Sequence, residues 1–390
     1  MRICIITSSF PLNPADARAA AGLFVKDFAV ALAEEGHRVT VVTPDKRPGE
    51  KEDPPGVSVR WFPWLGGRQT LSSLRPYHPI DALAMVSLFR QGRRALEELI
   101  ARDRPDHVLA MWAVPAGRLA AGLRARHGIP FTVWCLGSDI WTYGRYPVLR
   151  GVVRRVLRAA DLVYADGLDL AARVERLSAR PCPFLPSSRR LNRGLIQPLN
   201  LPADEFKFLF VGRYAPVKGV DVLLEAMARY VQEGHRGHLY MFGGGPLDGY
   251  VRERAARPDL RDRVTVGGYA DEQVVVSYLE ACDCLVIPSR MESIPVIFSD
   301  ALQMGRPLIV SDVGDMGRLL RECPAGLVVP PEDTAALARA MADMAFGDRQ
   351  RYDDPARKLT ERFNVVTVIK TWLTQITPPT TSPAVSPVSR

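Results

Sequence analysis

Short apolar runs rich in β-branched residues alternate with amphipathic stretches along the whole chain, and this alternation most constrains the fold. Strands are predicted at 2–7, 38–43, 57–62, 107–111, 131–135 and 162–165, and again at 207–211, 238–242, 264–266, 284–287, 308–310 and 327–329. Helices are predicted between them, at 22–34, 81–101, 115–126, 148–159 and 219–231, where apolar residues recur every three or four positions. Near-continuous apolar strands separated by helices predict parallel sheets that are covered on both faces.

The pattern of strand, sharp turn and helix opens each half of the 390-residue chain, a length that favours two domains. We therefore expect an α/β protein with two doubly wound, Rossmann-like domains facing each other across a cleft. The domains are expected at 1–187 and 205–355, joined by a linker at 188–204 rich in Pro, Arg and Asn. A helical piece at 356–376 is expected to pack back on the first domain, and the Pro/Ser/Thr-rich tail at 377–390 to be disordered.

The composition, 47% hydrophobic with a mean hydropathy of −0.03, is that of a globular protein with sizeable cores. No apolar stretch reaches the roughly 18 residues that a membrane span needs, and the first residues form a strand pattern instead of a signal peptide. The six cysteines are scattered, and the pair Cys282 and Cys284 has no metal-ligand spacing. These features predict a cytoplasmic protein with reduced cysteines and no metal site.

Charge is distributed unevenly between the two halves. Residues 1–190 carry 28 lysines and arginines against 18 acids, whereas the rest carries 23 against 25. The basic excess indicates an anionic partner for the first half, such as a phospholipid surface, a lipid phosphate or an acidic saccharide. Nucleic acid is excluded as the expected partner, because no basic stripe with interleaved aromatic residues is present.

Two cations follow the first strand of the second half. Arg213 and Lys218 come directly after the run at 207–211, at the carboxyl edge where open α/β sheets bind ligands. Together they can neutralise a diphosphate, above all one that gains charge as a leaving group. The competing explanation is a surface salt bridge with a solvated lysine.

A glycine run, Gly243, Gly244 and Gly245, lies between the next strand and a helix. Glycines allow the backbone to approach a ligand closely, although an ordinary tight turn explains the run equally well. The run does not match the dinucleotide fingerprint, because position 248 is Asp where a third glycine is needed.

Two acids, Glu292 and Asp300, stand eight positions apart around the predicted start of a helix near Pro295. The backbone amides there, at Ser293, Val296 and Ile297, together with the helix dipole, make an anion site for phosphate. We expect Glu292 just before the helix, and Asp300 one turn or more inside it and facing the same cleft. A helix-capping Glu and a solvated Asp are the alternative.

The ordered set from Val211 to Val313 resembles the carboxyl-terminal half of retaining glycosyltransferases with the two-domain GT-B fold, in particular glycosyltransferase family 4 (the group 1 type). The resemblance implies that Arg213 and Lys218 hold the donor diphosphate. It also places Gly243–Gly245 near the nucleoside, Gly268–Tyr269 near the base, Glu292 near the donor sugar and Asp300 on the ribose.

Matches in the first half, at 8–44 and 134–139, extend the resemblance over most of the chain. Gly22 is similar to the family's loop glycine, which lets backbone approach the donor phosphate, although ordinary helix onset also fits. Leu136-Gly137-Ser138-Asp139 resembles a motif that usually begins with His, so the histidine contact to the donor sugar is missing here. Asp139 is a candidate catalytic residue, with a helix N-cap as the alternative.

The second half departs from the family pattern at two points. Asp300 is one methylene shorter than the usual second Glu, and Ser293-Ile294-Pro295 replaces a glycine-rich stretch. Pro295 also removes one amide donor. A longer or water-mediated ribose contact is the consequence we expect.

The resemblance implies a metal-independent hexosyltransferase that needs no cofactor and uses a nucleoside-diphosphate sugar, UDP- or GDP-linked, as co-substrate. Its acceptor would be a glycan or lipid-linked hydroxyl, as in cell-surface polysaccharide or glycolipid synthesis, and the anomeric configuration would be retained. The alternatives are a nucleotide-sugar epimerase or phosphorylase of the same fold, or a non-catalytic relative that binds polyanions or membranes.

The segment 141–160 mixes aromatic residues, arginines and apolar residues at helical spacing. A basic amphipathic helix of this kind can lie on an anionic membrane, which would place the protein at the inner membrane face. A helix that packs on the core and exposes its arginines is the competing interpretation.

Overall fold

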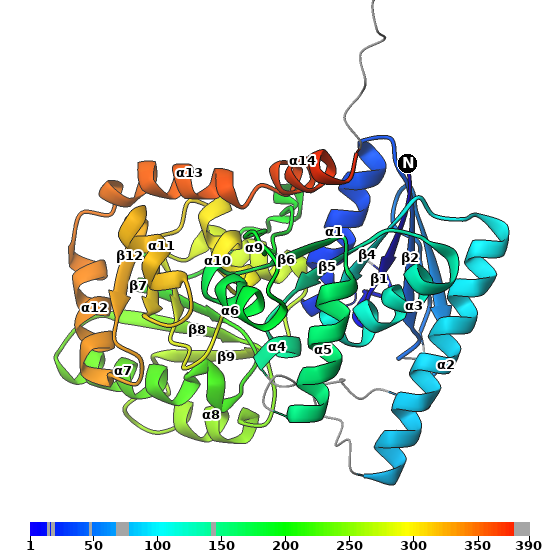
Figure 1. The fold of residues 1–390 in the computed structure, drawn as a ribbon. Coiled ribbons are helices and arrows are strands. Elements are labelled where there is room, and N and C mark those ends of the chain that lie inside the picture. The colour runs from blue at the N-terminus through cyan, green and yellow to red at the C-terminus, as the bar shows by residue number, and fades with distance from the viewer. Residues whose placement is uncertain (14–15, 17–19, 47–48, 68–77, 142–145, 378–390) are drawn as a thin grey trace, which may run out of the picture.

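The computed structural model describes residues 1–13, 16, 20–46, 49–67, 78–141 and 146–377. Two parallel six-stranded sheets form two domains that lie side by side (Figure 1). The sheet of the first domain contains β1 (Arg2–Ile6), β2 (Arg38–Pro44), β3 (Val57–Phe62), β4 (His107–Met111), β5 (Phe131–Cys135) and β6 (Leu162–Ala165), in the order β3-β2-β1-β4-β5-β6.

The second sheet repeats the order of the first. It contains β7 (Phe206–Val211), β8 (Gly237–Phe242), β9 (Val264–Gly268), β10 (Cys284–Ile287), β11 (Leu308–Ser311) and β12 (Gly326–Val329), in the order β12-β11-β10-β7-β8-β9. In each sheet the strand order reverses beside the first strand, β1 or β7, which is the doubly wound topology expected from the sequence. The fold class is confirmed, and the twelve predicted strands are all present with ends shifted by at most two residues.

Helices cover both faces of the first sheet. They are α1 (Ala20–Glu34), α2 (Pro79–Arg102), α3 (Arg118–His127), α4 (Ser138–Trp141), α5 (Pro147–Ala159) and α6 (Leu168–Ser178). Because successive strand residues point to opposite faces, Ile3 and Ile5 pack with α1 whereas Cys4 and Ile6 pack with α2, α3, α5 and α6. The helix predicted over 115–126 begins three residues later, since an irregular turn, η3 (Ala113–Gly117), precedes it.

Helices of the second domain divide in the same way. One face of its sheet carries α7 (Val220–Gln232), α8 (Asp248–Ala255) and α12 (Thr334–Phe346), and the other carries α9 (Glu272–Ala281), α10 (Val296–Gln303) and α11 (Met316–Glu322). Short 3-10 turns lie at η5 (Arg193–Leu195), η6 (Pro216–Lys218) and η7 (Gln350–Tyr352). The segment 188–204 runs between the domains and includes η5.

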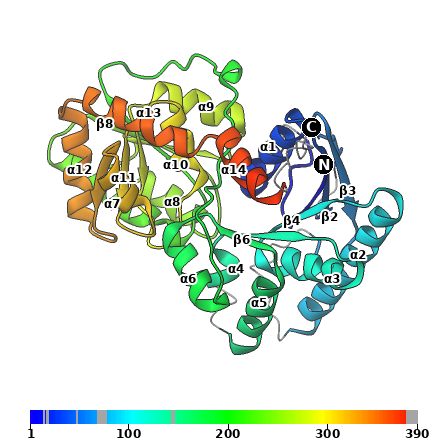
Figure 2. The same cartoon turned by 45° about the horizontal axis from the view of Figure 1, so that its top comes forward.

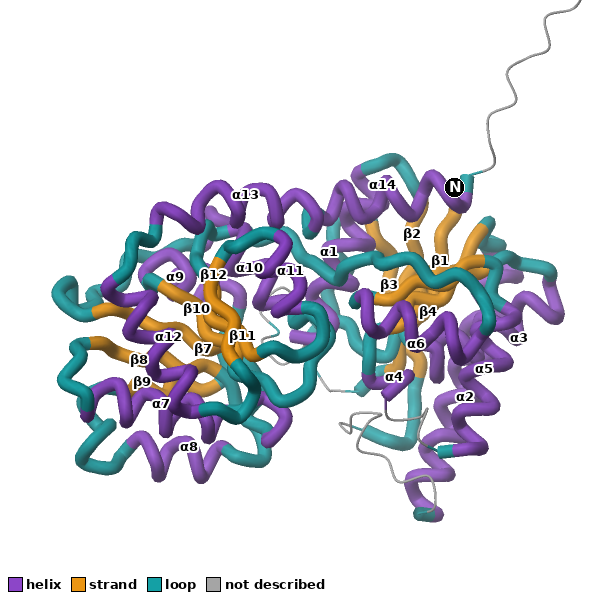
Figure 3. Tube along the Cα trace, turned by 60° about the vertical axis from the view of Figure 1, so that its left-hand side comes forward, coloured by secondary structure: helices purple, strands orange, loops and turns teal. Residues whose placement is uncertain are grey.

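The piece expected as one helix at 356–376 is two helices, α13 (Asp353–Arg362) and α14 (Val365–Ile376). Asn364 separates them, because its side chain accepts a hydrogen bond from the Val366 amide at 2.9 Å and starts a new helix. α13 packs on α10 of the second domain, whereas α14 packs on α1 of the first, and the pair runs along one side of both domains (Figures 2 and 3). It is therefore the second part of the expected piece, α14, that packs on the first domain.

Trp372 anchors α14 against the first domain through contacts with α1 and β5. Its ring is fully buried beside Phe28, and its indole N–H donates to Thr132 at 3.1 Å. The tail at 378–390, predicted to be disordered, lies outside the described residues.

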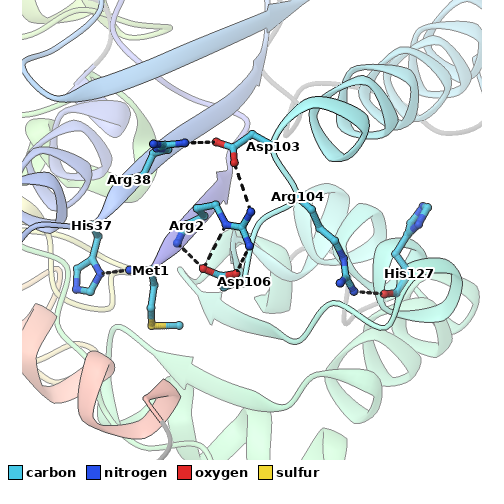
Figure 4. Close-up of polar contacts among 8 residues, drawn as sticks. All are labelled: Met1, Arg2, His37, Arg38, Asp103, Arg104, Asp106 and His127. Carbon is cyan, nitrogen blue, oxygen red and sulfur yellow. Dashed lines mark hydrogen bonds and ion pairs between the residues drawn. The ribbon is translucent and has the colours of Figure 1, made fainter.

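Polar contacts join residues at the amino ends of β1, β2 and β4 (Figure 4). The Arg2 amide and guanidinium both donate to Asp106 at 2.7 Å, and Arg38 lies 3.4 Å from Asp103. These groups are largely exposed, so each pair contributes little to stability.

The apolar face of α5 is buried in the core of the first domain, through Val153, Val156 and Leu157. Core packing therefore accounts for the amphipathic pattern of 146–160, and residues 142–145 of the same segment lie outside the described residues. At the amino end of α5, Tyr146 and Val148 remain exposed, Val148 by 79%. Across the described ranges, no helix is both long and apolar enough to cross a bilayer.

Candidate active site at the facing carboxyl edges of the two sheets

The second sheet reverses its order between β7 and β10, and the loops after these two strands carry the predicted charged residues. Crevices at such switch points are where open α/β sheets bind ligands. Lys218 ends η6, after β7, and Glu292 lies in the loop between β10 and α10. Lys218 and Glu292, although 74 positions apart in sequence, form an ion pair.

Backbone contacts fix the two loops together. The amide of Arg290 donates to the carbonyl of Val217 at 2.9 Å, and the Arg290 guanidinium also contacts the carbonyl of Pro216 at 2.6 Å. Gly219 has φ +65°, and a Cβ there would overlap the carbonyl oxygen of Pro288. Only glycine fits this approach, which brings Lys218 against the loop that contains Glu292.

The glycine run lies against the turn after β7. The amide of Tyr214 donates to the carbonyl of Gly244 at 2.9 Å, and a Cβ on Gly245 would come within 3.1 Å of the Arg213 side chain. A Cβ on Gly244 would come within 2.7 Å of the Tyr269 ring. Gly243 has φ +150°, and a Cβ there would overlap the carbonyl of Gly212. The run is thus packed between two loops that both hold predicted site residues.

Arg213 and Tyr269 are available for a ligand at this edge. Arg213 is exposed, and its guanidinium makes no hydrogen bond or ion pair with any residue the structure describes. Tyr269 is 64% exposed beside Gly244. The structure therefore brings Arg213, Gly243–Gly245 and Tyr269 together, with Lys218 and Glu292 on the adjoining loops.

α10 begins where the sequence predicts, with Pro295 as the N-cap residue and Val296 and Ile297 in the first turn. No side chain caps this helix start. Ser293 is buried, and its hydroxyl has no hydrogen-bond partner among the described residues. Val296 packs against the core of the first domain, so the start of α10 lies at the domain boundary.

Asp300 is buried, whereas the sequence predicted that it would face the same cleft as Glu292. Its side chain is 1% exposed, and Arg189, from the segment between the domains, donates to Oδ2 through Nη2 at 2.7 Å and to Oδ1 through Nε at 3.1 Å. The side-chain amide of Gln303, on the same helix, donates to the carbonyl of Arg189 at 2.8 Å. Asp300 is held in a buried ion pair with Arg189, whose guanidinium contacts both carboxylate oxygens, and the ribose contact stays a prediction.

Gly22 lies inside α1 and is buried. A Cβ on Gly22 would come within 2.9 Å of the Phe10 backbone, so the glycine is required by the loop between β1 and α1. This close packing of the chain on itself explains the glycine without a ligand.

Asp139 is buried at the carboxyl end of β5, with 1% of its surface exposed. Its carboxylate accepts hydrogen bonds from the amides of Ala113, at 2.6 Å, and Leu136, at 3.3 Å. Burial raises the pKa of Asp139 to about 6, while these hydrogen bonds oppose the rise. Asp139 is the second residue of α4 and not its N-cap, and both of its carboxylate oxygens accept hydrogen bonds from backbone amides of the neighbouring loops. Its catalytic role stays a prediction.

Asp166 is a candidate that the sequence reasoning did not single out. It follows β6 at the domain boundary, is 6% exposed, and its Oδ1 has no partner among the residues described. Burial, reinforced by the negative charge of Asp139, raises the pKa of Asp166 well above its ordinary range. The sequence signal for Asp166 was its position as an acid directly after a strand of the first half. The sequence could not show that its neighbour in space is Ser293 of the other domain.

Glu292 also lines a groove of about 550 Å³ between the domains. Its walls come from α6 and Trp141 on one side, and from the loops after β10 and β11 on the other. The amide of Asp169 donates to Asp315 across this boundary at 3.2 Å. Another cavity, of about 670 Å³, lies between α1 and the linker and contains none of the predicted site residues. Over the described ranges, no cluster of His, Cys, Asp and Glu has the arrangement of a metal site.

Two facing, doubly wound domains with a charged crevice at the switch point of the second define a GT-B type protein. The family model described as "Glycosyl transferases group 1" matches residues 205–345, and that of the "Glycosyl transferase 4-like domain" matches residues 20–185. The chain therefore belongs to the group 1 glycosyltransferases of the GT-B fold.

Relatives align over different shares of the chain. The alpha-D-kanosaminyltransferase of Streptomyces kanamyceticus is 32% identical, but over only 34% of either chain. A putative teichuronic acid biosynthesis glycosyltransferase of Bacillus subtilis is 26% identical over 87% of this chain and 88% of its own length. A putative colanic acid biosynthesis glycosyltransferase of Escherichia coli is 27% identical over 75% of this chain and 76% of its own.

Solved structures share the fold at low sequence identity. A sucrose-phosphate synthase from Thermosynechococcus elongatus superposes with a TM-score of 0.75 at 22% identity, covering 96% of this chain and 98% of the other. HepE from Anabaena, solved in complex with UDP-glucose, superposes with a TM-score of 0.69 at 18% identity, covering 96% and 99%.

Proposed function

We propose that this glycosyltransferase moves a hexose from a nucleoside-diphosphate sugar to a hydroxyl of a glycan or lipid-linked acceptor, with retention of the anomeric configuration. The observation that carries the proposal is the Lys218–Glu292 pair at the β7/β10 switch point, with the unpaired Arg213 on the loop that contains Lys218. A diphosphate needs cations and a sugar needs acceptors for its hydroxyls, and both are present at one edge of one sheet.

Without a donor, Lys218 and Glu292 neutralise each other. Donor binding would exchange these partners: the ammonium of Lys218 turns to the diphosphate, and the carboxylate of Glu292 accepts hydrogen bonds from the sugar hydroxyls. Arg213 supplies a second positive charge. Because charge on the diphosphate increases as the sugar leaves, both cations stabilise the transition state more than the ground state.

Retention follows when the leaving diphosphate and the acceptor share one face of the sugar. The bond between the anomeric carbon and the diphosphate oxygen breaks, and the bond to the acceptor oxygen forms on that face. The acceptor proton moves to the departing phosphate, so no protein nucleophile is required. The two cations take the part that a metal ion plays in other transferases, which makes the proposed reaction independent of metal.

Two features support the donor and the setting. The Anabaena structure with UDP-glucose supports a nucleoside-diphosphate sugar, and we propose a UDP- or GDP-linked donor. Relatives named for teichuronic acid and colanic acid synthesis support an acceptor in cell-surface polysaccharide assembly.

A thermal-shift panel with UDP, GDP, ADP and their sugars tests the donor class. A ligand that binds the folded state raises the unfolding midpoint by mass action. We expect the midpoint to rise with either UDP and its sugars or GDP and its sugars, in the wild type and in the control Lys358→Ala. Lys358 is an exposed lysine of α13. The rise should be smaller in Lys218→Ala. No rise for any nucleotide sugar would refute the proposal. Sugar transfer followed by NMR of the product anomer then tests retention.

An epimerase, a phosphorylase and a non-catalytic relative predict other results. An epimerase would alter the donor sugar with no acceptor present, and a phosphorylase would cleave glycan in the presence of phosphate. A non-catalytic relative would keep its partner when Lys218 is replaced by Ala.

We also propose that the amino end of α5 touches an anionic membrane at the cytoplasmic face. Exposed Tyr146 and Val148 lie there beside the exposed arginines Arg150 and Arg154. Apolar side chains flanked by arginines suit the headgroup region of such a membrane. Flotation with anionic and neutral liposomes tests the proposal, and equal recovery with both would contradict it.

A further inference from the structure

The groove beside Glu292 carries positive charge that the donor does not require. Its first-domain wall is the exposed face of α6, with Asp169, Arg173 and Arg176, and its second-domain wall includes Arg290 and Glu292. The two α6 arginines are three positions apart, so they lie on one face of the helix, about one turn apart. Both are therefore directed at the same space.

These two guanidinium groups are uncompensated. The side chains of Arg173 and Arg176 are exposed and make no ion pair or hydrogen bond within the described part of the chain. Arg290, in contrast, is bound by Asp221 at 2.7 Å and Glu332 at 2.8 Å, which raises the pKa of its guanidinium above the ordinary value.

The acids of the groove do not cancel this charge. Glu292 is paired with Lys218, and Asp169 is the one lining acid without an ion pair among the described residues. Before a donor binds, two free cations face one free acid, so the groove attracts an anion. When the donor takes Lys218, Glu292 becomes a second free acid on the second-domain wall, and the anion site is then the Arg173–Arg176 pair on the α6 wall.

We propose that this groove binds the acceptor through a fixed anionic group, a phosphate or a carboxylate, held by Arg173 and Arg176. The inference rests on the proposed transfer function and names the chemical class of its acceptor. Guanidinium groups bind such oxyanions through paired, charge-assisted hydrogen bonds. With the anion on α6, the remainder of the acceptor lies along the groove and its hydroxyl reaches the sugar near Glu292.

The remaining walls suit a sugar ring. Trp141 and Met291 line the same groove, and Met291 is 46% exposed, so an apolar sugar face has surfaces to cover. Asp169 can accept a hydrogen bond from a sugar hydroxyl. The groove thus offers an anion site, an apolar wall and an acceptor of hydrogen bonds.

The anion site is separate from the diphosphate position. Arg213 and Lys218, which we propose to hold the diphosphate, are not among the residues that line the groove, and Arg213 lies beside Gly245. Two anions, one on each substrate, are therefore expected to bind at once.

Direct binding of three probes tests the proposal: farnesyl phosphate, digalacturonic acid and lactose. Each is titrated into the wild type with excess UDP or GDP present, so that the diphosphate position is filled. The test variant is Arg173→Gln/Arg176→Gln. The matched control is Arg90→Gln/Arg102→Gln, which makes the same charge change at two exposed arginines of α2.

We expect one anionic probe to bind the wild type and the control at least about tenfold more tightly than it binds the test variant. This difference corresponds to the loss of a charge-assisted hydrogen bond. Lactose should show no such difference. A preference for farnesyl phosphate identifies a lipid phosphate, and one for digalacturonic acid identifies an acidic saccharide.

Equal affinity of both anionic probes for wild type and test variant would overturn the proposal, as would no binding of either to the wild type. Displacement of the probe by the nucleotide would also overturn it, because the anion would then occupy the donor site. The rise in unfolding midpoint with UDP or GDP is measured on the same samples. Its persistence in the test variant shows that the donor site is intact, and its absence in the wild type would instead refute the donor proposal.

Discussion

Arg189 and Asp300 form a bidentate ion pair that joins the linker to α10, with both side chains almost fully buried. Burial opposes the charge on Arg189, but the Asp300 carboxylate outweighs it, so the pKa of the guanidinium lies above its ordinary value. The acid that the family pattern assigns to the ribose thus serves the interdomain connection in this chain.

Removing one member of this pair should be costly, because the other charge stays buried. We predict that Arg189→Met lowers the free energy of unfolding by about 3–5 kcal/mol. Arg190→Met is the matched control, since its pair with Glu34 is exposed, by 48% and 52%, and should contribute under about 1 kcal/mol. Urea denaturation measures the free energy of unfolding of both variants. Equal losses would show that the buried pair contributes no more to stability than the exposed one.

Asp300→Asn should leave nucleotide binding nearly unchanged. The Asp300 oxygens are occupied by Arg189 and lie away from the groove, so the variant is expected to bind UDP or GDP within about twofold of the wild type. Stability should fall in the same variant, for the reason given above. A large loss of nucleotide affinity with unchanged stability would instead support a ribose contact.

The raised pKa of Asp166 predicts that the stability of the protein depends on pH. Because its pKa is raised in the folded state, its contribution is full below the ordinary value of about 3.9 and is lost as pH rises through the folded pKa. Asn cannot ionise, so Asp166→Asn should gain stability relative to the wild type as pH rises. Unfolding midpoints at about pH 4 and about pH 8 measure this change. A difference that is the same at both values would contradict the prediction.

Gly219 fixes the position of Lys218, and a side chain there should disturb both packing and binding. Gly219→Ala combines strain at φ +65° with overlap on Pro288, and we expect a loss of stability of at least about 1–3 kcal/mol together with weaker nucleotide binding. Gly234→Ala is the control, because Gly234 has φ +85° but a Cβ there would meet no atom within 4 Å. Thermal unfolding should separate the two variants, and an equal loss would mean that the contact with Pro288 is unimportant.

Much of the fold follows from local sequence. The ends of strands such as Val57–Phe62 and Cys284–Ile287 agree with the prediction to the residue. A buried parallel strand appears in the sequence as an apolar run, and residues typical of turns mark both of its ends. The break between α13 and α14 was missed. It depends on one capping side chain, Asn364, inside a pattern that is otherwise helical on both sides.

The site was predictable where it depends on strand ends. Lys218 and Glu292 each follow a central strand, so their meeting follows from parallel topology. The fate of Asp300 was not predictable, because its partner Arg189 lies 111 positions away in the linker. Asp166 was missed for a similar reason, since its environment is made by Asp139 and by Ser293 of the other domain.

The central claim is that Arg213 and Lys218 bind the diphosphate of the donor. Calorimetric titration of UDP and GDP into wild type, Arg213→Ala, Lys218→Ala and the control Lys358→Ala tests it most directly. We predict that one nucleotide binds the wild type and the control equally, and that each of the other variants binds it about tenfold or more weakly. Equal affinity in all four proteins, or no nucleotide binding by the wild type, would contradict the claim.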